Sequence, residues 1–210
     1  MNKSIIKICG IKHPDMAKLA IMAGANLIGI VFHPASSRYV TPADAISIVD
    51  AVSRAGAIPV GIFVNQTVRE MREICEQINI DTVQLHGVIS RAHHQLLPKH
   101  FKRIYVQNLS NQGDLVADEG LQYLKPERDL ILIDHNDPGK GKSINRKRFH
   151  YHLPFSWLLA GGLSPVNVTT VMADLQPDGV DVSSGVELSS GIKDPLLIQQ
   201  FISAVRGHHD

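Results

Sequence analysis

Short apolar segments alternate with amphipathic segments along the whole chain. Eight segments rich in Ile, Val and Leu begin about 20 to 30 residues apart. They are apolar almost throughout, which is typical of strands buried on both faces of a parallel sheet. We therefore predict strands over residues 5–9, 27–31, 58–63, 82–85, 103–106, 130–133, 157–160 and 179–182.

Between these segments, apolar residues recur at the three- and four-residue spacing of helices. After Thr67, for example, Val68, Met71, Cys75 and Ile78 fall on one stripe. The pattern predicts helices over residues 15–23, 42–54, 67–77 and 196–206, the second with Thr41 as its N-cap. The stretches 108–124 and 145–154, which follow the fifth and sixth strands, show only a faint helical pattern.

These repeated units predict an α/β fold. Eight units in 210 residues match a (β/α)8 TIM barrel, with parallel strands inside and helices outside. An open doubly wound sheet is the alternative, but it usually carries a G-x-G-x-x-G turn after its first strand. Here the first strand ends in Cys9-Gly10-Ile11-Lys12. No shift in composition divides the chain, so one domain is expected over residues 1–210.

Charge and composition exclude several classes of partner. With 21 Lys and Arg against 20 Asp and Glu, the net charge of +1 provides no broad field for nucleic acid or an anionic membrane. The chain contains no run of 18 apolar residues, so no membrane span is expected. Its two cysteines are too few for a disulfide framework. We expect a cytoplasmic protein.

In a barrel of this kind, chemistry belongs to the loops that follow the strands. The loops after the seventh and eighth strands contain Gly161-Gly162 and Ser184-Gly185. Barrels often bind a phosphate group at these two places, and glycine lets the backbone approach the ligand closely. We therefore expect a phosphate site there, with plain turns as the alternative.

Cys9 and Asp134 are the candidates for acid and base chemistry. Cys9 ends the first strand, and alternation places Lys7 on the same face. A neighbouring ammonium group favours the thiolate, which would make Cys9 a base or nucleophile near neutral pH. A buried structural cysteine is the equal alternative. Asp134 follows the sixth apolar segment, where burial would suit a general acid, although most aspartates in such places cap loops.

Other polar residues after the strands include Asn65, Gln84 and Gln107, and His86 is the histidine of most interest. Arg38 is a single cation in a loop of small residues, so it either clamps a substrate carboxylate or lies on the surface.

The histidines are scattered and predict no metal site. The segment 139–143 ends like a phosphate-binding P-loop but lacks the first glycine of that motif and has no strand directly before it, so we reject an ATP site.

Six separated motifs resemble the phosphoribosylanthranilate isomerase family of tryptophan biosynthesis. They include Lys7-Ile8-Cys9-Gly10-Ile11, Ser37-Arg38-Tyr39-Val40 and Val60-Gly61-Ile62-Phe63-Val64-Asn65. The others are Thr82-Val83-Gln84-Leu85-His86-Gly87, Leu159-Ala160-Gly161-Gly162-Leu163, and the run 179–187 with Gly191-Ile192-Lys193-Asp194. The segment 138–146 departs from the family pattern directly after Asp134, since it keeps two glycines and loses an aromatic pair.

The resemblance implies a cofactor-free Amadori rearrangement of a phosphosugar-anthranilate substrate, in a monomer or a homodimer. Asp134 would be the general acid and Cys9 the general base. Arg38 would hold the anthranilate carboxylate and Asp181 a sugar hydroxyl. The loops at Gly161, Gly162, Ser184 and Gly185 would hold the phosphate, and His86 completes the expected substrate site.

Two other interpretations remain at this stage. One is another phosphosugar barrel, either an epimerase or the indole-forming synthase of the same pathway. The first would generally need metal ligands and the second a lysine acid at a strand end, and neither is evident in the sequence. The other interpretation is a protein that binds a phosphate ligand without turnover.

Overall fold

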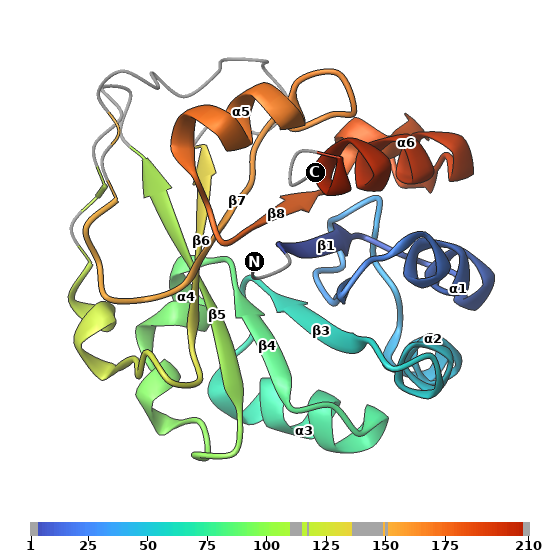
Figure 1. Cartoon of the computed structure of the whole chain (residues 1–210). Helices are drawn as coiled ribbons and strands as arrows, with labels where there is room; N and C mark the ends of the chain where they lie inside the picture. The colour runs from blue at the N-terminus through green and yellow to red at the C-terminus, as the bar shows by residue number, and fades with distance from the viewer. Residues whose placement is uncertain (1–3, 110–114, 117, 136–148, 150, 208–210) are drawn as a thin grey trace.

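Eight parallel strands close into a barrel (Figure 1). The computed structural model describes residues 4–109, 115–116, 118–135, 149 and 151–207. The strands follow one another around the barrel in chain order, and the first pairs with the eighth to close it. They are β1 (Ile5–Cys9), β2 (Leu27–Val31), β3 (Ile58–Phe63), β4 (Thr82–Leu85), β5 (Lys102–Leu109), β6 (Leu130–His135), β7 (Trp157–Leu159) and β8 (Gly179–Val182). The predicted TIM barrel is confirmed, and the open sheet is excluded.

The strands differ from the prediction at the ends of β5, β6 and β7. β5 and β6 run on past their apolar segments and pair through Asn108 with Asp134 and Leu109 with His135. Pairing between neighbouring strands, rather than hydrophobicity, sets these ends. Asp134 therefore lies on β6, not in the loop after it. β7 ends at Leu159, one residue earlier than predicted.

The four predicted helices are present, and capping residues set their ends. They are α1 (Pro14–Ala23), α2 (Pro42–Arg54), α3 (Val68–Ile78) and α6 (Pro195–Arg206). Thr41 caps α2 as predicted. Thr67 was expected inside α3, but its side chain and that of Glu70 form a capping box, so the helix begins one residue later. The structure also contains α5 (Val168–Leu175), which we did not predict.

The side of the barrel formed by β4, β5 and β6 is covered by short helices and turns instead of long helices. Its short elements are α4 (Val88–Ala92) and the 3-10 turns η1 (His94–Leu96) and η2 (Glu119–Tyr123). Buried polar contacts join these turns to the strands. We call His94, Arg103, Tyr105, Asp118 and Asp129 the outer network. The faint helical pattern after the fifth strand thus corresponds to a 3-10 turn.

Arg103 and Asp129 form the centre of the outer network. The Asp129 carboxylate accepts from Arg103 Nε at 3.0 Å, from the Arg103 backbone N–H at 3.2 Å and from the Lys125 backbone N–H at 2.7 Å. Arg103 also donates to His94 Nδ1 at 3.1 Å, so the other ring nitrogen carries the proton and donates to the Gly120 carbonyl at 3.0 Å. These bonds satisfy charges that are almost fully buried.

The apolar core has two layers, one on each face of the barrel wall. Alternation along each strand sends side chains inward and outward in turn. In β1, Ile6 and Ile8 point outward and pack in the layer beneath the helices, whereas Ile5 and Cys9 point inward. The inner layer is filled by residues such as Val60, Ile62, Val106, Leu132 and Leu158.

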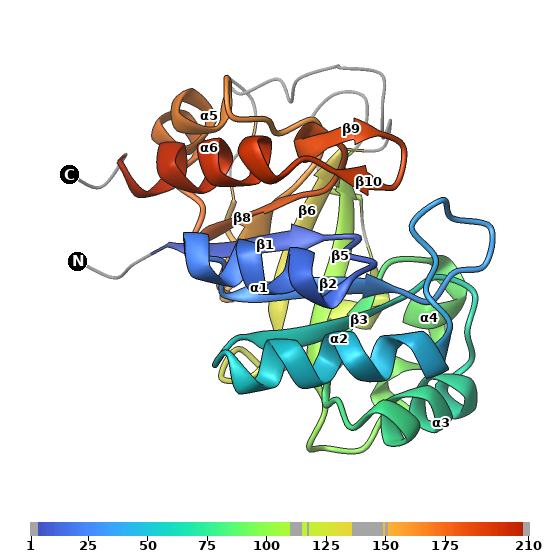
Figure 2. The same cartoon turned by 90° about the vertical axis from the view of Figure 1, so that its right-hand side faces the viewer.

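A small hairpin follows β8 and was not predicted. It consists of β9 (Glu187–Ser189) and β10 (Ile192–Lys193), which are antiparallel. In Figure 2 it lies at the end of the barrel toward which the arrow of β1 points.

The segment 138–146, its P-loop-like part 139–143 and the residues after 207 lie outside the described residues. Within the part of the chain that the structure describes, no helix is long and apolar enough to cross a membrane.

Candidate active site

A cavity of about 440 Å³ opens where the strands end. The nine residues to which the family resemblance gives a role all line it: Cys9, Arg38, His86, Asp134, Gly161, Gly162, Asp181, Ser184 and Gly185. They come from β1, β6 and β8 and from the loops after β2, β4, β7 and β8. The barrel thus brings together residues that are far apart in the chain. Gln84 also lines the cavity, whereas Asn65 and Gln107 do not.

Cys9 lies directly above a buried ion pair. Lys7 Nζ, which is fully buried, is 2.8 Å from Asp181 Oδ1 on the neighbouring strand β8. Gly29 faces both Cys9 and Lys7 from β2, where a side chain would approach Cys9 Sγ to 2.9 Å and Lys7 Nζ to 3.2 Å. The glycine leaves room for the thiol and the ammonium group inside the barrel.

The pKa of Cys9 does not follow the simple expectation. Burial raises it above the usual 9.0, the charge of Lys7 lowers it and the charge of Asp181 raises it again. Lys7 therefore acts in the predicted direction, but burial prevails and the net pKa is raised. Burial therefore favours the thiol near neutral pH, which corrects the prediction of a thiolate based on Lys7.

Asp134 faces His86 across the cavity. His86 Nε2 lies 3.9 Å from Asp134 Oδ2, and His86 Nδ1 lies 3.4 Å from the Gln84 amide nitrogen. Burial and the charge of Lys7 lower the pKa of His86, so its ring is neutral at neutral pH. Gln84 Oε1 is buried and has no hydrogen-bond partner among the described residues. It can therefore accept a hydrogen bond from a ligand.

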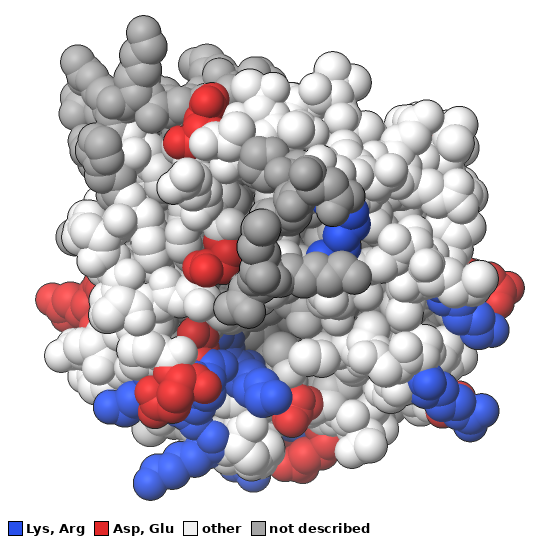
Figure 3. All heavy atoms as spheres, in the orientation of Figure 1, with Lys and Arg blue, Asp and Glu red and all other residues white. Residues whose placement is uncertain are grey.

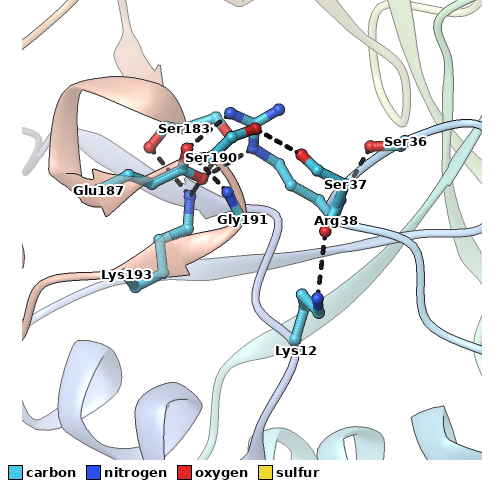
Figure 4. Close-up of polar contacts among 9 residues, drawn as sticks. All are labelled: Lys12, Ser36, Ser37, Arg38, Ser183, Glu187, Ser190, Gly191 and Lys193. Carbon is cyan, nitrogen blue, oxygen red and sulfur yellow. Dashed lines mark hydrogen bonds and ion pairs between the residues drawn. The ribbon is translucent and has the colours of Figure 1, made fainter.

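Arg38 is not a lone cation, and it is not a surface residue. Its Nε and Nη2 donate to the two carboxylate oxygens of Glu187, at 2.7 and 2.6 Å (Figure 4). Its side chain is 24% exposed and that of Glu187 is 4% exposed. The stem of Arg38 crosses Gly10, where a Cβ would lie 2.5 Å from Arg38 Cδ. Arg38 thus reaches the cavity beside Cys9 because residue 10 has no side chain.

Glu187 is shared with a second cation. Lys193 Nζ lies 2.7 Å from Glu187 Oε1 and donates to the Ser183 carbonyl at 2.9 Å. Burial acts to raise the pKa of Glu187, but the hydrogen bonds from Arg38 and Lys193 prevail and lower it to about 2. We call Lys7, Arg38, Asp181, Glu187 and Lys193 the mouth network.

The two glycine loops pack directly on each other. Gly161 and Gly162 have φ angles of 90° and 66°, which strongly favour glycine. A Cβ on Gly185 would collide with the Leu163 carbonyl. Asn167 braces the first loop, accepting from the Ser164 N–H at 2.8 Å and donating to the Gly162 carbonyl at 2.9 Å. Backbone groups of both loops therefore face the same end of the cavity.

Sequence reasoning missed Glu187 and Lys193 as partners of the site. Both fall within motifs of the resemblance, but nothing in their local pattern links them to Arg38. The signal that was available is Ser190-Gly191, a two-residue turn between short β-prone segments.

Charged side chains of both signs lie interspersed on the face drawn in Figure 3, in keeping with a net charge of +1. An anionic ligand must therefore be held by local groups such as those of the mouth network.

Comparisons with known proteins agree with this geometry. A family model described as N-(5'phosphoribosyl)anthranilate (PRA) isomerase matches residues 6–204. Over 202 residues the chain is 38% identical to the N-(5'-phosphoribosyl)anthranilate isomerase of Chlamydia caviae, covering 96% of both chains.

Two solved structures are similar along almost their whole length. One is a PRA isomerase in complex with reduced 1-(o-carboxyphenylamino)-1-deoxyribulose 5-phosphate, with 32% identity, a TM-score of 0.78, and coverage of 97% of this chain and 99% of that one. The other, described as monomers of the dimeric enzyme of Thermotoga maritima, has 31% identity, a TM-score of 0.74 and the same coverage.

Proposed function

The chain belongs to the N-(5'-phosphoribosyl)anthranilate isomerase family, and we propose that Cys9 is its general base and Asp134 its general acid. Membership confirms the resemblance drawn from the motifs and identifies the protein as an isomerase of tryptophan biosynthesis. Membership also excludes the three alternative interpretations, which were an epimerase, the indole-forming synthase, and a protein that binds a phosphate ligand without turnover. The observation that carries the proposal is that one cavity is lined by the Asp134 carboxyl group, the Cys9 thiol, the Arg38 guanidinium group and the two glycine loops.

The reaction converts N-(5'-phosphoribosyl)anthranilate into 1-(2-carboxyphenylamino)-1-deoxyribulose 5-phosphate. In our proposal Asp134 gives its proton to the ring oxygen of the sugar, the bond from that oxygen to C1 breaks, and a protonated Schiff base forms. Cys9 then removes the proton from C2, and the electron pair of that bond moves to give an enolamine. The enolamine tautomerises to the ketone of the product. The proposal uses no metal or cofactor.

Cys9 must lose its proton before it can act as this base. Lys7 and Lys193 favour the thiolate, but burial prevails and raises the pKa of Cys9. The protonated Schiff base supplies a positive charge next to the thiol, and a charge of that sign lowers a thiol pKa. The substrate therefore helps to generate the base at the step that needs it.

The ends of the substrate are held by different groups. Arg38 binds the anthranilate carboxylate, and the backbone of the two glycine loops binds the phosphate. Asp181 accepts a hydrogen bond from a sugar hydroxyl, and His86 orients the Asp134 carboxyl from 3.9 Å. Gln84 Oε1, which is unpartnered among the described residues, provides a further acceptor for a hydroxyl.

A fluorescence assay tests the proposal. PRA is generated in place, and its decay is followed with purified protein in the presence of EDTA. We expect catalysed decay with the wild type, and a loss of turnover of roughly 10²-fold or more with Cys9→Ala and with Asp134→Asn. The matched control is Cys75→Ala, because Cys75 lies on the buried face of α3 and does not line the cavity. Near-wild-type turnover in either site variant would remove the role assigned to that residue.

Two wider proposals accompany this one. We keep one domain for residues 1–210, since β1 and β8 from the two ends of the chain pair in the same barrel. We also propose that the protein is cytoplasmic. It is either a monomer or a homodimer, and sedimentation of the purified protein decides between the two.

A further inference from the structure

The hairpin formed by β9 and β10 contributes little to the apolar core. Its residues Leu188 and Ile192 are 69% and 57% exposed. Its tip instead rests on the loop that carries Arg38. Ser190 Oγ lies 2.7 Å from Ser37 Oγ, and a Cβ on Gly191 would lie only 2.5 Å from the Ser37 carbonyl oxygen. The hairpin is therefore held by polar contacts to the site, not by burial of apolar side chains (Figure 4).

Glu187 fixes Arg38 without using up its hydrogen-bonding capacity. The guanidinium group has five N–H donors. Glu187 takes one on Nε and one on Nη2, along one edge of the group. The donors on Nη1 and the second donor on Nη2 have no partner among the described residues. They form a second fork that can receive a substrate carboxylate while Glu187 keeps its place.

Lys193 extends this arrangement to the loop after β8. Its Nζ contacts Glu187 Oε1 at 2.7 Å, the Ser183 carbonyl at 2.9 Å and Ser183 Oγ at 3.3 Å. Ser183 directly precedes Ser184 and Gly185, which line the cavity at the proposed phosphate end. Lys193 has a side chain that is 3% exposed, so water does not compete effectively for these contacts.

One chain of contacts thus runs from Arg38 through Glu187 and Lys193 to Ser183. We propose that Glu187 and Lys193 are positioning residues that set the spacing between the carboxylate clamp and the phosphate loop. They select substrates that carry both anionic groups at that separation. This inference rests on the proposed function of Arg38 and of the glycine loops. It adds that Glu187 holds the clamp in place and that Lys193 supports the loop at the phosphate end.

The test separates the two ends of the substrate. The variants are Glu187→Gln and Lys193→Met, and two quantities are measured: KM for PRA, and the inhibition constant of inorganic phosphate as a competitor. For Glu187→Gln we expect KM to rise about tenfold with a smaller change in kcat and an unchanged phosphate constant, because only the clamp is released. For Lys193→Met both KM and the phosphate constant rise, since Ser183 loses its support as well.

Two further variants serve as controls. Glu73→Gln makes the same substitution in an exposed Arg–Glu pair on α3 and leaves both quantities unchanged. Lys193→Arg keeps the positive charge, so we expect its inhibition constant for phosphate to lie much closer to the wild-type value than that of Lys193→Met. If Glu187→Gln fails to fold, the double variant Glu187→Gln/Lys193→Met avoids leaving a buried lysine without its counter-charge, and it must still raise KM.

Several results would overturn the inference. One is a lowered melting temperature for Glu187→Gln with KM unchanged, which leaves a structural role only. Another is an equal rise of KM and of the phosphate constant in Glu187→Gln, because the two ends would then not be separable. Arg38→Met is measured in parallel. A raised KM there with no effect of Glu187→Gln rejects this inference alone, whereas an unchanged KM for Arg38→Met rejects the clamp itself.

Discussion

The outer network and the mouth network both bury charged side chains against the barrel wall, but they differ in what lies beside them. In the outer network, donors from Arg103 and Lys125 surround the Asp129 carboxylate, which is fully buried. In the mouth network, Arg38 and Asp181 line the cavity and keep groups that a ligand can use. Buried charge by itself therefore does not mark a functional site. A functional site is marked by buried charged groups that also line a cavity, as Arg38 and Asp181 do.

Substitution of Asp129 gives the largest expected difference between the two networks. Asp129→Asn leaves the Arg103 guanidinium, which is 2% exposed, without its counter-charge. We expect a loss of about 3–5 kcal/mol in the free energy of unfolding, with kcat of the folded protein unchanged. Urea denaturation and the PRA assay measure the two quantities. Asp50→Asn is the control: its exposed pair with Arg54 on α2 is worth about 0.5 kcal/mol or less. A fall in kcat with intact stability would contradict the contrast.

The second expected difference between the networks is a pH-dependent stability that comes from His94 of the outer network. Burial and the charge of Arg103 lower the pKa of His94 from 6.5 to about 4. Below pH 6.5 the unfolded chain gains a proton at this residue that the folded chain does not, so the stability falls until the pH reaches about 4. We expect a loss on the order of 3 kcal/mol across this range. His94→Gln, measured by the same denaturation series, removes this part of the slope. An identical slope in the variant would exclude His94 as its source.

Arg38→Met tests the mouth network with a smaller expected effect. The substitution removes the fork while Lys193 remains as a partner for Glu187. Because a hydrogen bond to a charged group is worth about 1.5–3 kcal/mol, we expect KM for PRA to rise roughly tenfold to a hundredfold. Arg69→Met, which breaks the exposed pair with Glu73, is the matched control. An unchanged KM would mean that Arg38 does not touch the substrate.

Lys7→Met gives the smallest expected shift and examines Cys9 directly. The ammonium group of Lys7 lowers the pKa of Cys9, and its removal leaves Asp181 to raise it. We expect the midpoint of Cys9 alkylation by iodoacetamide to move to higher pH. Peptide mapping follows Cys9 separately from Cys75, whose burial raises its pKa to about 12. A midpoint that stays in place would show that Lys7 does not act on the thiol.

The fold was predictable because its signals are local. Apolar segments located all eight strands, and Thr41 located the start of α2. The ends of β5 and β6 were not predictable, since pairing between strands carries polar residues such as Asn108 and Asp134 into them. The outer network was not predictable for a similar reason. Arg103 and Asp129 are 26 residues apart, and no local sequence pattern links one to the other.

The candidate site was predictable in its members but not in its electrostatics. The rule that chemistry follows the strand ends, together with the motifs, selected Cys9, Arg38 and Asp134, which line one cavity. The sequence showed Lys7 beneath Cys9, but it did not show how deeply both are buried or that Asp181 opposes Lys7. It also gave no reason to join Arg38 to Glu187, which lies 149 residues further along the chain.

The ion pair beneath Cys9 joins residues that are 174 positions apart, one on β1 and the other on β8. It can form only when the two ends of the chain meet, and contacts of such long range cost the most chain entropy to close. The environment of the thiol is therefore completed in the same event that seals the barrel. During refolding, the return of Cys9 reactivity to its native pH dependence would time barrel closure, and a fragment lacking β8 would not show it.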